Sequence, residues 1–271
     1  GTLGSSVRAT AWAETGMTAH TPSQPAGNLN ASPHGLFRRL RREIRHLWMA
    51  LSPHLRRERN RWVRRDGVAF LGALGIVPGD AVVDFGCGWG AYSLPAARLV
   101  GERGLVISVD VNVHVLSRLR RRAAAEGLPN IHAVSDLDAA KSLLEARPCQ
   151  AVLLYDVLHF MDTGERERLY AAFRGVLDAA GRLSIHPKHV NGDQPARFLQ
   201  DSTVEDIIRE VANAGFHLAD RKTARLWHDH GQTQGTVLTF CPAATGPGER
   251  LPAPAHAETD NVCTPSEGRR A

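Results

Sequence analysis

The chain has 271 residues, of which 43% are hydrophobic and 23% charged, so it can bury a core and is not globally disordered. No apolar run reaches the ~18 residues that cross a bilayer, which excludes an integral membrane protein. The chain has a net charge of +5, and its positive charge is concentrated in residues 36–66, which contain eleven Arg but only three acidic residues. The remainder is therefore mildly acidic, which excludes a uniformly basic nucleic-acid binder.

The two ends of the chain are expected to be disordered tails. Residues 1–34 and 243–271 are rich in Gly, Pro and small polar residues and hold a single aromatic residue, Trp12. They bury too little apolar surface to offset the entropy of ordering. The four scattered Cys and the lack of a secretory start favour a reducing, cytoplasmic compartment.

Residues 35–75 are expected to form a basic helical segment, a lid or an interface. Ser52-Pro53 is typical of an N-cap followed by a first-turn proline, and Gly75 of a helix end. Phe37, Leu40 and further apolar residues recur every three or four positions, with Arg on the other faces. An ordinary solvated helix, a lid on a ligand site and peripheral membrane contact through residues 36–66 all remain open.

Residues 76–242 alternate short apolar runs with helical patterns. The expected strands are Ala81–Phe85, Leu105–Asp110, Ile131–Ser135, Ala151–Tyr155, Leu183–Ile185, His217–Ala219 and Val237–Phe240. The expected helices are Ala91–Leu99, Val113–Glu126, Ala139–Glu145, Glu165–Ala179 and Val204–Ala214. This alternation predicts an α/β fold: a Rossmann-like, doubly wound, mostly parallel seven-stranded sheet. The last two strands, with no helix between them, are expected to form an antiparallel hairpin at one edge.

A glycine-rich turn follows the first of these strands. Gly86, Gly88 and Gly90 alternate directly after Asp84, and such a turn lets the backbone approach a ligand closely. A dinucleotide pyrophosphate would fit such a loop, but the Asp84 carboxylate would repel it and suits a cation instead.

With this turn the sequence resembles the class I S-adenosylmethionine-dependent methyltransferases, whose first motif has the pattern acidic-x-Gly-x-Gly-x-Gly. The resemblance extends to three other segments, Leu74–Asp80, Pro95–Gly101 and Ala180–Leu183. It covers roughly Leu74 to Pro242. It implies a methyltransferase of class EC 2.1.1 with S-adenosyl-L-methionine as cofactor. Within the family the sequence resembles enzymes that act on quinones and other small molecules, which implies a small, hydrophobic acceptor.

The resemblance also implies cofactor contacts, position by position. Asp84 and Gly86 would contact the methionine end of the cofactor, within the turn that includes Cys87, Gly88 and Gly90. Asp110, at the end of the second strand and followed by Val111, would accept the ribose hydroxyls. Further contacts would come from Asp136 and Leu137 at the adenine, and from Tyr155 and Asp156 after the fourth strand. Asp136 equally suits a plain helix N-cap.

Three histidines are candidates for a catalytic base. His159 follows the fourth strand, and His186 and His189 follow the fifth, at the edge where open α/β sheets bind ligands. Ordinary loop histidines are an equally good explanation, because the chain has thirteen. The same abundance accounts for the metal-like spacing of His228 and His230, and no metal is predicted.

Two other function classes stay in competition with a methyltransferase. One is a Rossmann oxidoreductase that uses a nicotinamide cofactor. The other is a non-catalytic protein that binds S-adenosylmethionine or associates with nucleic acid through the basic segment. The segment Tyr155–Phe160 lacks the Asn/Asp-Pro-Pro-aromatic sequence of enzymes that methylate the amino groups of bases, which disfavours nucleic acid as the acceptor. The sequence carries no sign of the oligomeric state.

Overall fold

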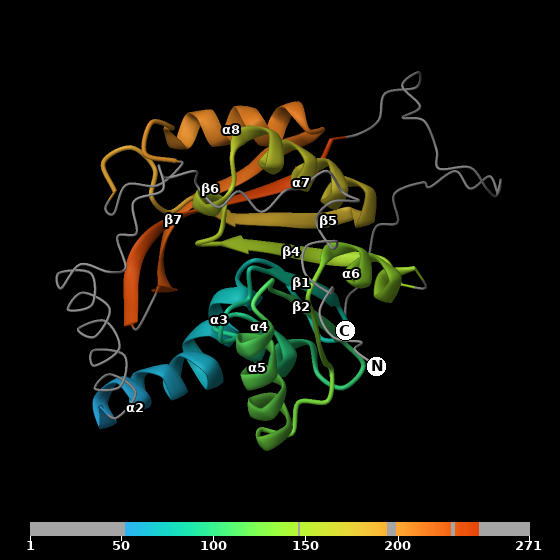
Figure 1. Ribbon diagram of the computed structural model, residues 1–271, viewed down its shortest axis with the longest axis vertical. Helices are drawn as coiled ribbons and strands as arrows, with labels where there is room; N and C mark the ends of the chain where they lie inside the picture. Colours follow the sequence, from blue (N-terminus) through green and yellow to red (C-terminus); the bar gives the residue numbers. More distant parts are fainter. Residues whose placement is uncertain (1–51, 146, 194–198, 229–230, 244–271) are drawn as a thin grey trace, which may run out of the picture.

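The computed structural model describes residues 52–145, 147–193, 199–228 and 231–243 (Figure 1). The expected tail 1–34, nearly all of the tail 243–271 and the first part of the basic segment lie outside the described residues. Within the described ranges, no helix has both the length and the apolar character that a membrane crossing requires.

A seven-stranded sheet with the order β3-β2-β1-β4-β5-β7-β6 forms the centre of the molecule. Its strands are β1 (Ala81–Phe85), β2 (Leu105–Val109), β3 (Ile131–Val134), β4 (Cys149–Tyr155), β5 (Leu177–His186), β6 (Phe216–His228) and β7 (Gly231–Pro242). The pairs from β3 to β5 are parallel, whereas β7 runs antiparallel to both β5 and β6. The predicted fold class, including the antiparallel hairpin at one edge, is confirmed.

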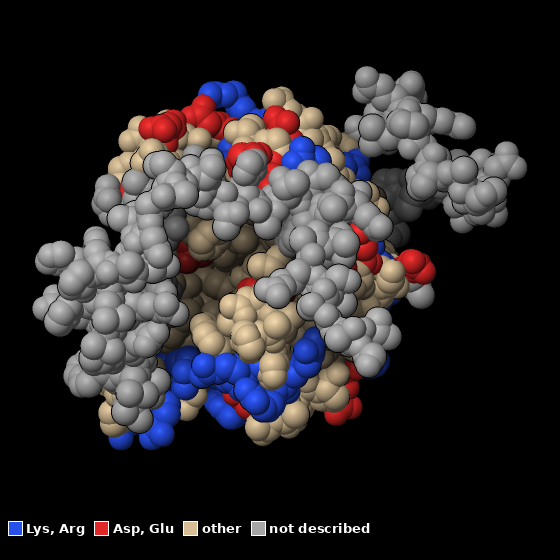
Figure 2. Space-filling view, viewed as in Figure 1, with Lys and Arg blue, Asp and Glu red and all other residues tan. Residues whose placement is uncertain are grey.

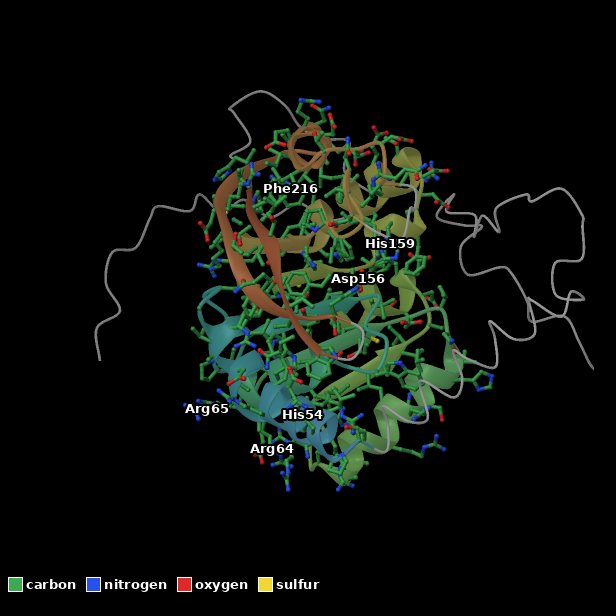
Figure 3. The ribbon with its side chains drawn as sticks, turned by 90° about the vertical axis from the view of Figure 1, so that its left-hand side faces the viewer. His54, Arg64, Arg65, Asp156, His159 and Phe216 are labelled. Atoms are coloured by element: carbon green, nitrogen blue, oxygen red, sulfur yellow. The ribbon has the colours of Figure 1, made fainter. Side chains whose placement is uncertain are left out.

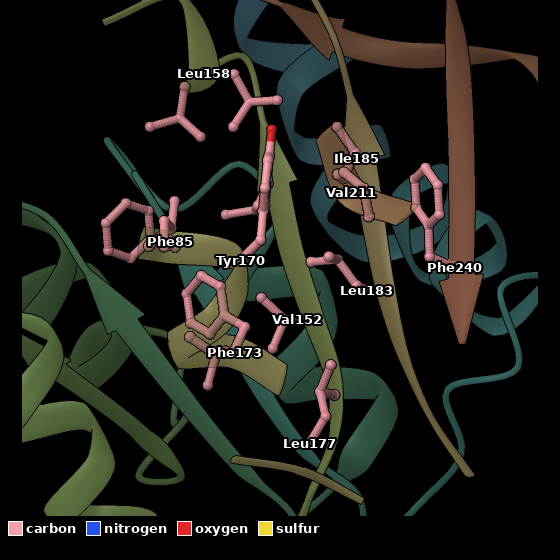
Figure 4. Close-up of a cluster of buried hydrophobic side chains, with 14 of the residues drawn as sticks. Phe85, Val152, Leu158, Tyr170, Phe173, Leu177, Leu183, Ile185, Val211 and Phe240 are labelled. Atoms are coloured by element: carbon pink, nitrogen blue, oxygen red, sulfur yellow. The ribbon is translucent and has the colours of Figure 1, made fainter. Parts of the chain in front are cut away.

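Helices cover both faces of this sheet, which explains why its central strands are continuously apolar. Neighbouring residues of one strand point to opposite faces: Val83 and Leu154 belong to one hydrophobic core, Val82 and Leu153 to the other. The first core packs β-strand residues against aromatic side chains such as Phe173 (Figure 4). Its helices are α6 (Leu137–Leu144), α7 (Thr163–Val176) and α8 (Val204–Asn213). They lie across the sheet from α3 (Gly67–Gly72), α4 (Ser93–Val100) and α5 (Val113–Ala125) (Figure 1).

The second core is covered by α4 (Ser93–Val100), α5 (Val113–Ala125) and the end of the basic segment. That segment is helical from Pro53 to Gly72, as predicted, but it is interrupted: α2 (Pro53–Arg61) and α3 (Gly67–Gly72) flank a π-helical turn, η1 (Trp62–Asp66). Trp62 is buried there, and its indole Nε1 donates to the Ala91 carbonyl oxygen over 2.8 Å. This contact fixes the segment to the loop that follows the glycine turn.

The largest differences from the predicted bounds lie in the last three strands. Helix α7 ends at Val176, and β5 begins at Leu177 where the sequence predicts continued helix; β6 and β7 have 13 and 12 residues where short strands are expected. The middle of β6 is exposed, so its side chains carry no apolar alternation. Its length is set by backbone pairing with β7, from Phe216↔Pro242 to His228↔Gly231.

Candidate active site

The glycine turn lies at the carboxyl end of β1, where it leaves space for a ligand. Gly86, Gly88 and Gly90 all have positive φ, of 75°, 48° and 80°. A Cβ at Gly86 would meet the Val157 side chain and one at Gly90 the Leu119 side chain, but a Cβ at Gly88 would meet no atom within 4 Å. The turn therefore packs against the protein on two sides and is open at its middle glycine, the arrangement that a loop cradling a ligand needs.

Asp84 lies beneath this turn as a buried carboxylate. Its Oδ2 accepts a hydrogen bond from the Ser93 hydroxyl over 2.5 Å. Burial raises the pKa of Asp84 to about 6, against the hydrogen bonds from Ser93 and with a contribution from the charge of Asp110. A strongly raised carboxyl pKa is typical of a functional position.

Asp110 faces the open part of the turn. One carboxylate oxygen accepts from the Gly88 amide over 2.9 Å and the other from the Asn112 amide over 2.8 Å. The side chain of Val111 beside it is exposed, as is the indole of Trp89 in the turn, 4.1 Å from the Arg118 guanidinium. A carboxylate and two exposed apolar side chains thus border the same opening, which suits a ligand with hydroxyl groups and a flat ring.

Three further predicted cofactor residues are buried or hydrogen-bonded within the protein. Asp136 is the N-cap of α6: its Oδ1 accepts from the Ala139 amide over 2.8 Å, so the N-cap alternative is confirmed. Leu137 and Cys87 are buried, and burial, followed by the charges of Asp84 and Asp110, raises the pKa of the Cys87 thiol far above its ordinary value. Contacts of these residues with a cofactor stay predictions.

Tyr155 joins an aromatic cluster beside the turn. Its ring packs edge-on against Tyr92, with ring centroids 4.5 Å apart, and also contacts Phe70. Its hydroxyl is 2.6 Å from the Ser184 hydroxyl. Burial raises the pKa of Tyr155 above its ordinary range, so the phenol stays protonated at neutral pH. The cluster continues to Trp62, which connects the basic segment to the end of β4.

A cluster of one carboxylate and three imidazoles occupies the next position along the edge. We call Asp156, His159, His189 and His228 the His/Asp cluster; its first two members lie together where β4 ends (Figure 3). His228 Nδ1 is 2.5 Å from Asp156 Oδ2, while Asp156 Oδ1 is 3.6 Å from His159 Nδ1 and 3.7 Å from His189 Nε2. Burial raises the pKa of Asp156, but the His228 hydrogen bond and the neighbouring imidazoles outweigh it and lower the pKa overall.

The predicted histidines thus divide into two groups. His159 and His189 are brought together with Asp156, whereas the buried His186 ring is hydrogen-bonded to the Thr236 carbonyl oxygen of β7 over 2.8 Å. Burial lowers the pKa of both His186 and His189, which favours the neutral imidazole at neutral pH. The structure tests no catalytic role for any of the three.

Sequence reasoning missed His228 as a partner of Asp156. The two residues are 72 positions apart, and β5 and β7 lie between β4 and β6 in the sheet, so only the path of the long β6–β7 hairpin brings them together. The signal in the sequence is the pair His228 and His230 after an apolar run, which the abundance of histidine explains equally well. His230 lies outside the described residues.

The His/Asp cluster adjoins the glycine turn directly. Val157, which follows Asp156, is the residue that a Cβ at Gly86 would touch, and the Tyr92 hydroxyl donates to the Trp227 carbonyl oxygen, beside His228, over 3.0 Å. In the view of Figure 2 the molecule is hollowed near the carboxyl end of β4, and the visible floor consists mostly of uncharged side chains. Arg64 and Arg65 lie apart from Asp156, at the outer edge (Figure 3).

Comparison with known proteins agrees with this geometry. Residues 82–181 match the family model described as a methyltransferase domain. Residues 82–181 are therefore similar to a methyltransferase domain, in agreement with the resemblance to the class I S-adenosylmethionine-dependent methyltransferases that the glycine turn indicates.

Individual relatives match only part of their length. Over 110 residues the chain is 34% identical to the aklanonic acid methyltransferase DauC of Streptomyces sp. (strain C5), a match that covers 40% of this chain and 48% of that protein. Over 72 residues it is 35% identical to the tRNA (adenine(58)-N(1))-methyltransferase TrmI of Thermus thermophilus, covering 27% of this chain and 28% of that protein. The chain thus spans less than half the length of these curated relatives.

Among solved structures, the fold is similar to the CcbJ methyltransferase from Streptomyces caelestis. The TM-score is 0.51 at 17% identity, with 66% of this chain and 89% of that chain covered. At this level of identity the likeness concerns the fold alone.

Proposed function

We propose that the protein transfers a methyl group from S-adenosylmethionine to a small molecule. The observation that carries the proposal is the opening at Gly88, where a Cβ would meet no atom within 4 Å and where the Asp110 carboxylate accepts the Gly88 amide. Residues Asp84, Gly88 and Asp110 would hold the cofactor, whose sulfonium supplies an already activated methyl group. The carboxylates of Asp84 and Asp110 suit a cofactor that carries both a positive charge and a ribose.

The protein's own contribution is to position the acceptor and to exclude water. For an acceptor that loses a proton, the His/Asp cluster supplies the base. His228 is its most accessible ring, with a side chain 16% exposed against 4% for His159 and 6% for His189. Its hydrogen bond to Asp156 orients the ring and stabilises the protonated form. His159, His186 and His189 stay candidates for the same task.

Three observations support a small acceptor with apolar surface. Trp89, Val111 and Phe160 are exposed large hydrophobic side chains on the loops after β1, β2 and β4. One of the matching relatives, DauC, is named for aklanonic acid. Arg64 and Arg65 of η1 lie at the outer edge of the molecule rather than at the cluster (Figure 3). The match to TrmI makes RNA the acceptor to exclude by experiment.

The strand order argues against a nicotinamide-dependent oxidoreductase. The dinucleotide-binding fold has the all-parallel order 3-2-1-4-5-6, whereas here the antiparallel β7 lies between β5 and β6. The proposal is tested by calorimetry: S-adenosylhomocysteine should bind in a 1:1 ratio and NADH should not. Methyl-labelled cofactor should then label aromatic or carboxylic small molecules rather than tRNA. Absence of S-adenosylhomocysteine binding would overturn the proposal.

Asp110→Asn should weaken S-adenosylhomocysteine binding about 10- to 100-fold, because a charged hydrogen bond contributes about 1.5–3 kcal/mol. The amide keeps the size of the side chain and one acceptor oxygen for the Gly88 amide. Titration calorimetry measures the affinity. Asp138→Asn, on the exposed face of α6, is the matched control and should bind like the original protein. Equal affinity of both variants would refute the ribose contact.

A further inference from the structure

We propose that Asp156, His159 and His189 form a binding site for a divalent transition-metal ion, with zinc as the best fit. One donor atom from each residue lies within 4.8 Å of the others, and His159 and His189 are buried. Two imidazoles and one carboxylate are the ligand set of many zinc sites that keep a position open for substrate.

The distances in the cluster suit a shared ion better than hydrogen bonds. Asp156 Oδ1 is 3.6 Å from His159 Nδ1 and 3.7 Å from His189 Nε2, beyond hydrogen-bonding range. Ligand atoms about 2.0–2.2 Å from a tetrahedral zinc ion are about 3.3–3.6 Å apart. The two carboxylate–imidazole distances are therefore close to the ligand spacing around zinc, and the two imidazole nitrogens lie within 4.8 Å of each other.

One buried polar atom of the cluster points to a missing partner. Within the described residues, Asp156 Oδ1 has no hydrogen-bond partner. Leaving a buried carboxylate oxygen unpaired is costly, and a native fold tolerates it where the group has another task. The other Asp156 oxygen bonds to His228, so that one oxygen is held while the other is directed at the two imidazoles. A fixed second oxygen is typical of carboxylate ligands to metals.

Backbone strain is concentrated at the same place. Among the described residues, Asp156 and His189 are the only two non-glycine residues with positive φ, at 58° and 64°. Such a conformation is unfavourable for a residue with a side chain and persists where the surroundings impose it, often at functional sites. Two residues from different loops, β4–α7 and β5–α8, both adopt this strained conformation and face each other.

The charge of the site indicates what the ion would bind. One carboxylate and two neutral imidazoles leave a divalent ion with a net charge of about +1 and an open position. An anionic oxygen fits there, as in a carboxylate, phenolate or enolate. This assignment of the acceptor class rests on the proposed methyl transfer; the existence of the metal site does not.

Untagged, chelator-treated protein should bind about one equivalent of Zn²⁺ in titration calorimetry, checked by elemental analysis after gel filtration. His189→Ala and Asp156→Asn should each weaken binding at least 100-fold. His228→Ala should weaken it about 10- to 100-fold, as expected of a residue that orients a ligand. His132→Ala removes an exposed imidazole from β3 and is the matched control, with unchanged binding.

Cobalt substitution of the original protein tests the site without any variant, and so does not depend on whether the variants fold. Co²⁺ should give the visible absorption bands of a four- or five-coordinate ion, and a carboxylic acid should shift them. Less than half an equivalent of Zn²⁺, or equal losses in the His132→Ala control, would overturn the site. S-adenosylhomocysteine binding without zinc binding refutes the metal site alone, whereas zinc binding without S-adenosylhomocysteine binding refutes the proposed function alone.

Discussion

Asp84→Asn is expected to stabilise the protein and to weaken cofactor binding at the same time. Burial raises the pKa of Asp84 from 3.8 to about 6 in the folded protein. The folded state therefore holds this proton more tightly than the unfolded chain does, so the free energy of unfolding falls as the pH rises from about 4 to about 6. Above that range the buried charge costs about 3 kcal/mol, at about 1.4 kcal/mol per pKa unit.

The neutral amide avoids this cost and still accepts the hydrogen bond from Ser93. Denaturant unfolding at about pH 8 should thus show a gain of up to about 3 kcal/mol, which disappears below about pH 4, where Asp84 is protonated in both states. Asp138→Asn should show no such gain. A variant less stable than the original protein at pH 8 would contradict the burial cost.

Cofactor binding should respond in the opposite direction. The proposed contact of Asp84 with the methionine ammonium needs the ionised carboxylate, so affinity for S-adenosylhomocysteine should fall as the pH drops through about 6. In Asp84→Asn the affinity should be about 10- to 100-fold lower at about pH 8 and should not change with pH in this range. Such an exchange of stability for binding is expected where a protein keeps a charge in its interior for function.

The parts of the fold that the sequence predicts well are those whose apolar side chains follow the period of a strand or of a helix. The bounds of β1 are predicted without error, and those of β2, β3 and α5 to within one residue. The edge strand β6 is different: from His217 to Arg221 its side chains are exposed, and only pairing with β7 defines it. Side-chain periodicity carries no signal where burial does not enforce one.

The candidate site divides in the same way. The glycine turn and Asp110 are local features of one strand–turn unit and its neighbour, so spacing along the chain indicates them. The contact between Asp156 and His228 depends on how β6 enters the sheet, a property of the whole chain. Nor does the sequence reveal that Trp62 is buried against the loop after the turn; its amphipathic helix equally suits a lid.

Gly88→Val should abolish measurable cofactor binding, with affinity reduced at least about 1,000-fold, which is about 4 kcal/mol. A Cβ at Gly88 would meet no protein atom within 4 Å, so the valine side chain would fill the opening itself. It would therefore exclude the ligand without displacing other parts of the protein. The positive φ of 48° strains a β-branched residue, and that strain costs about 1–3 kcal/mol of folding free energy. Calorimetry with S-adenosylhomocysteine measures the first effect and denaturant unfolding the second.

Gly127→Val separates these two effects. Gly127 has a similar φ of 66°, and a Cβ there would likewise meet no atom within 4 Å, but it lies in the turn between α5 and β3, at the opposite edge of the sheet. Both variants should lose a similar amount of stability, and only Gly88→Val should lose binding. If both bind S-adenosylhomocysteine equally, the ligand lies elsewhere than in the glycine turn, because no cofactor could share the space of a valine side chain at Gly88.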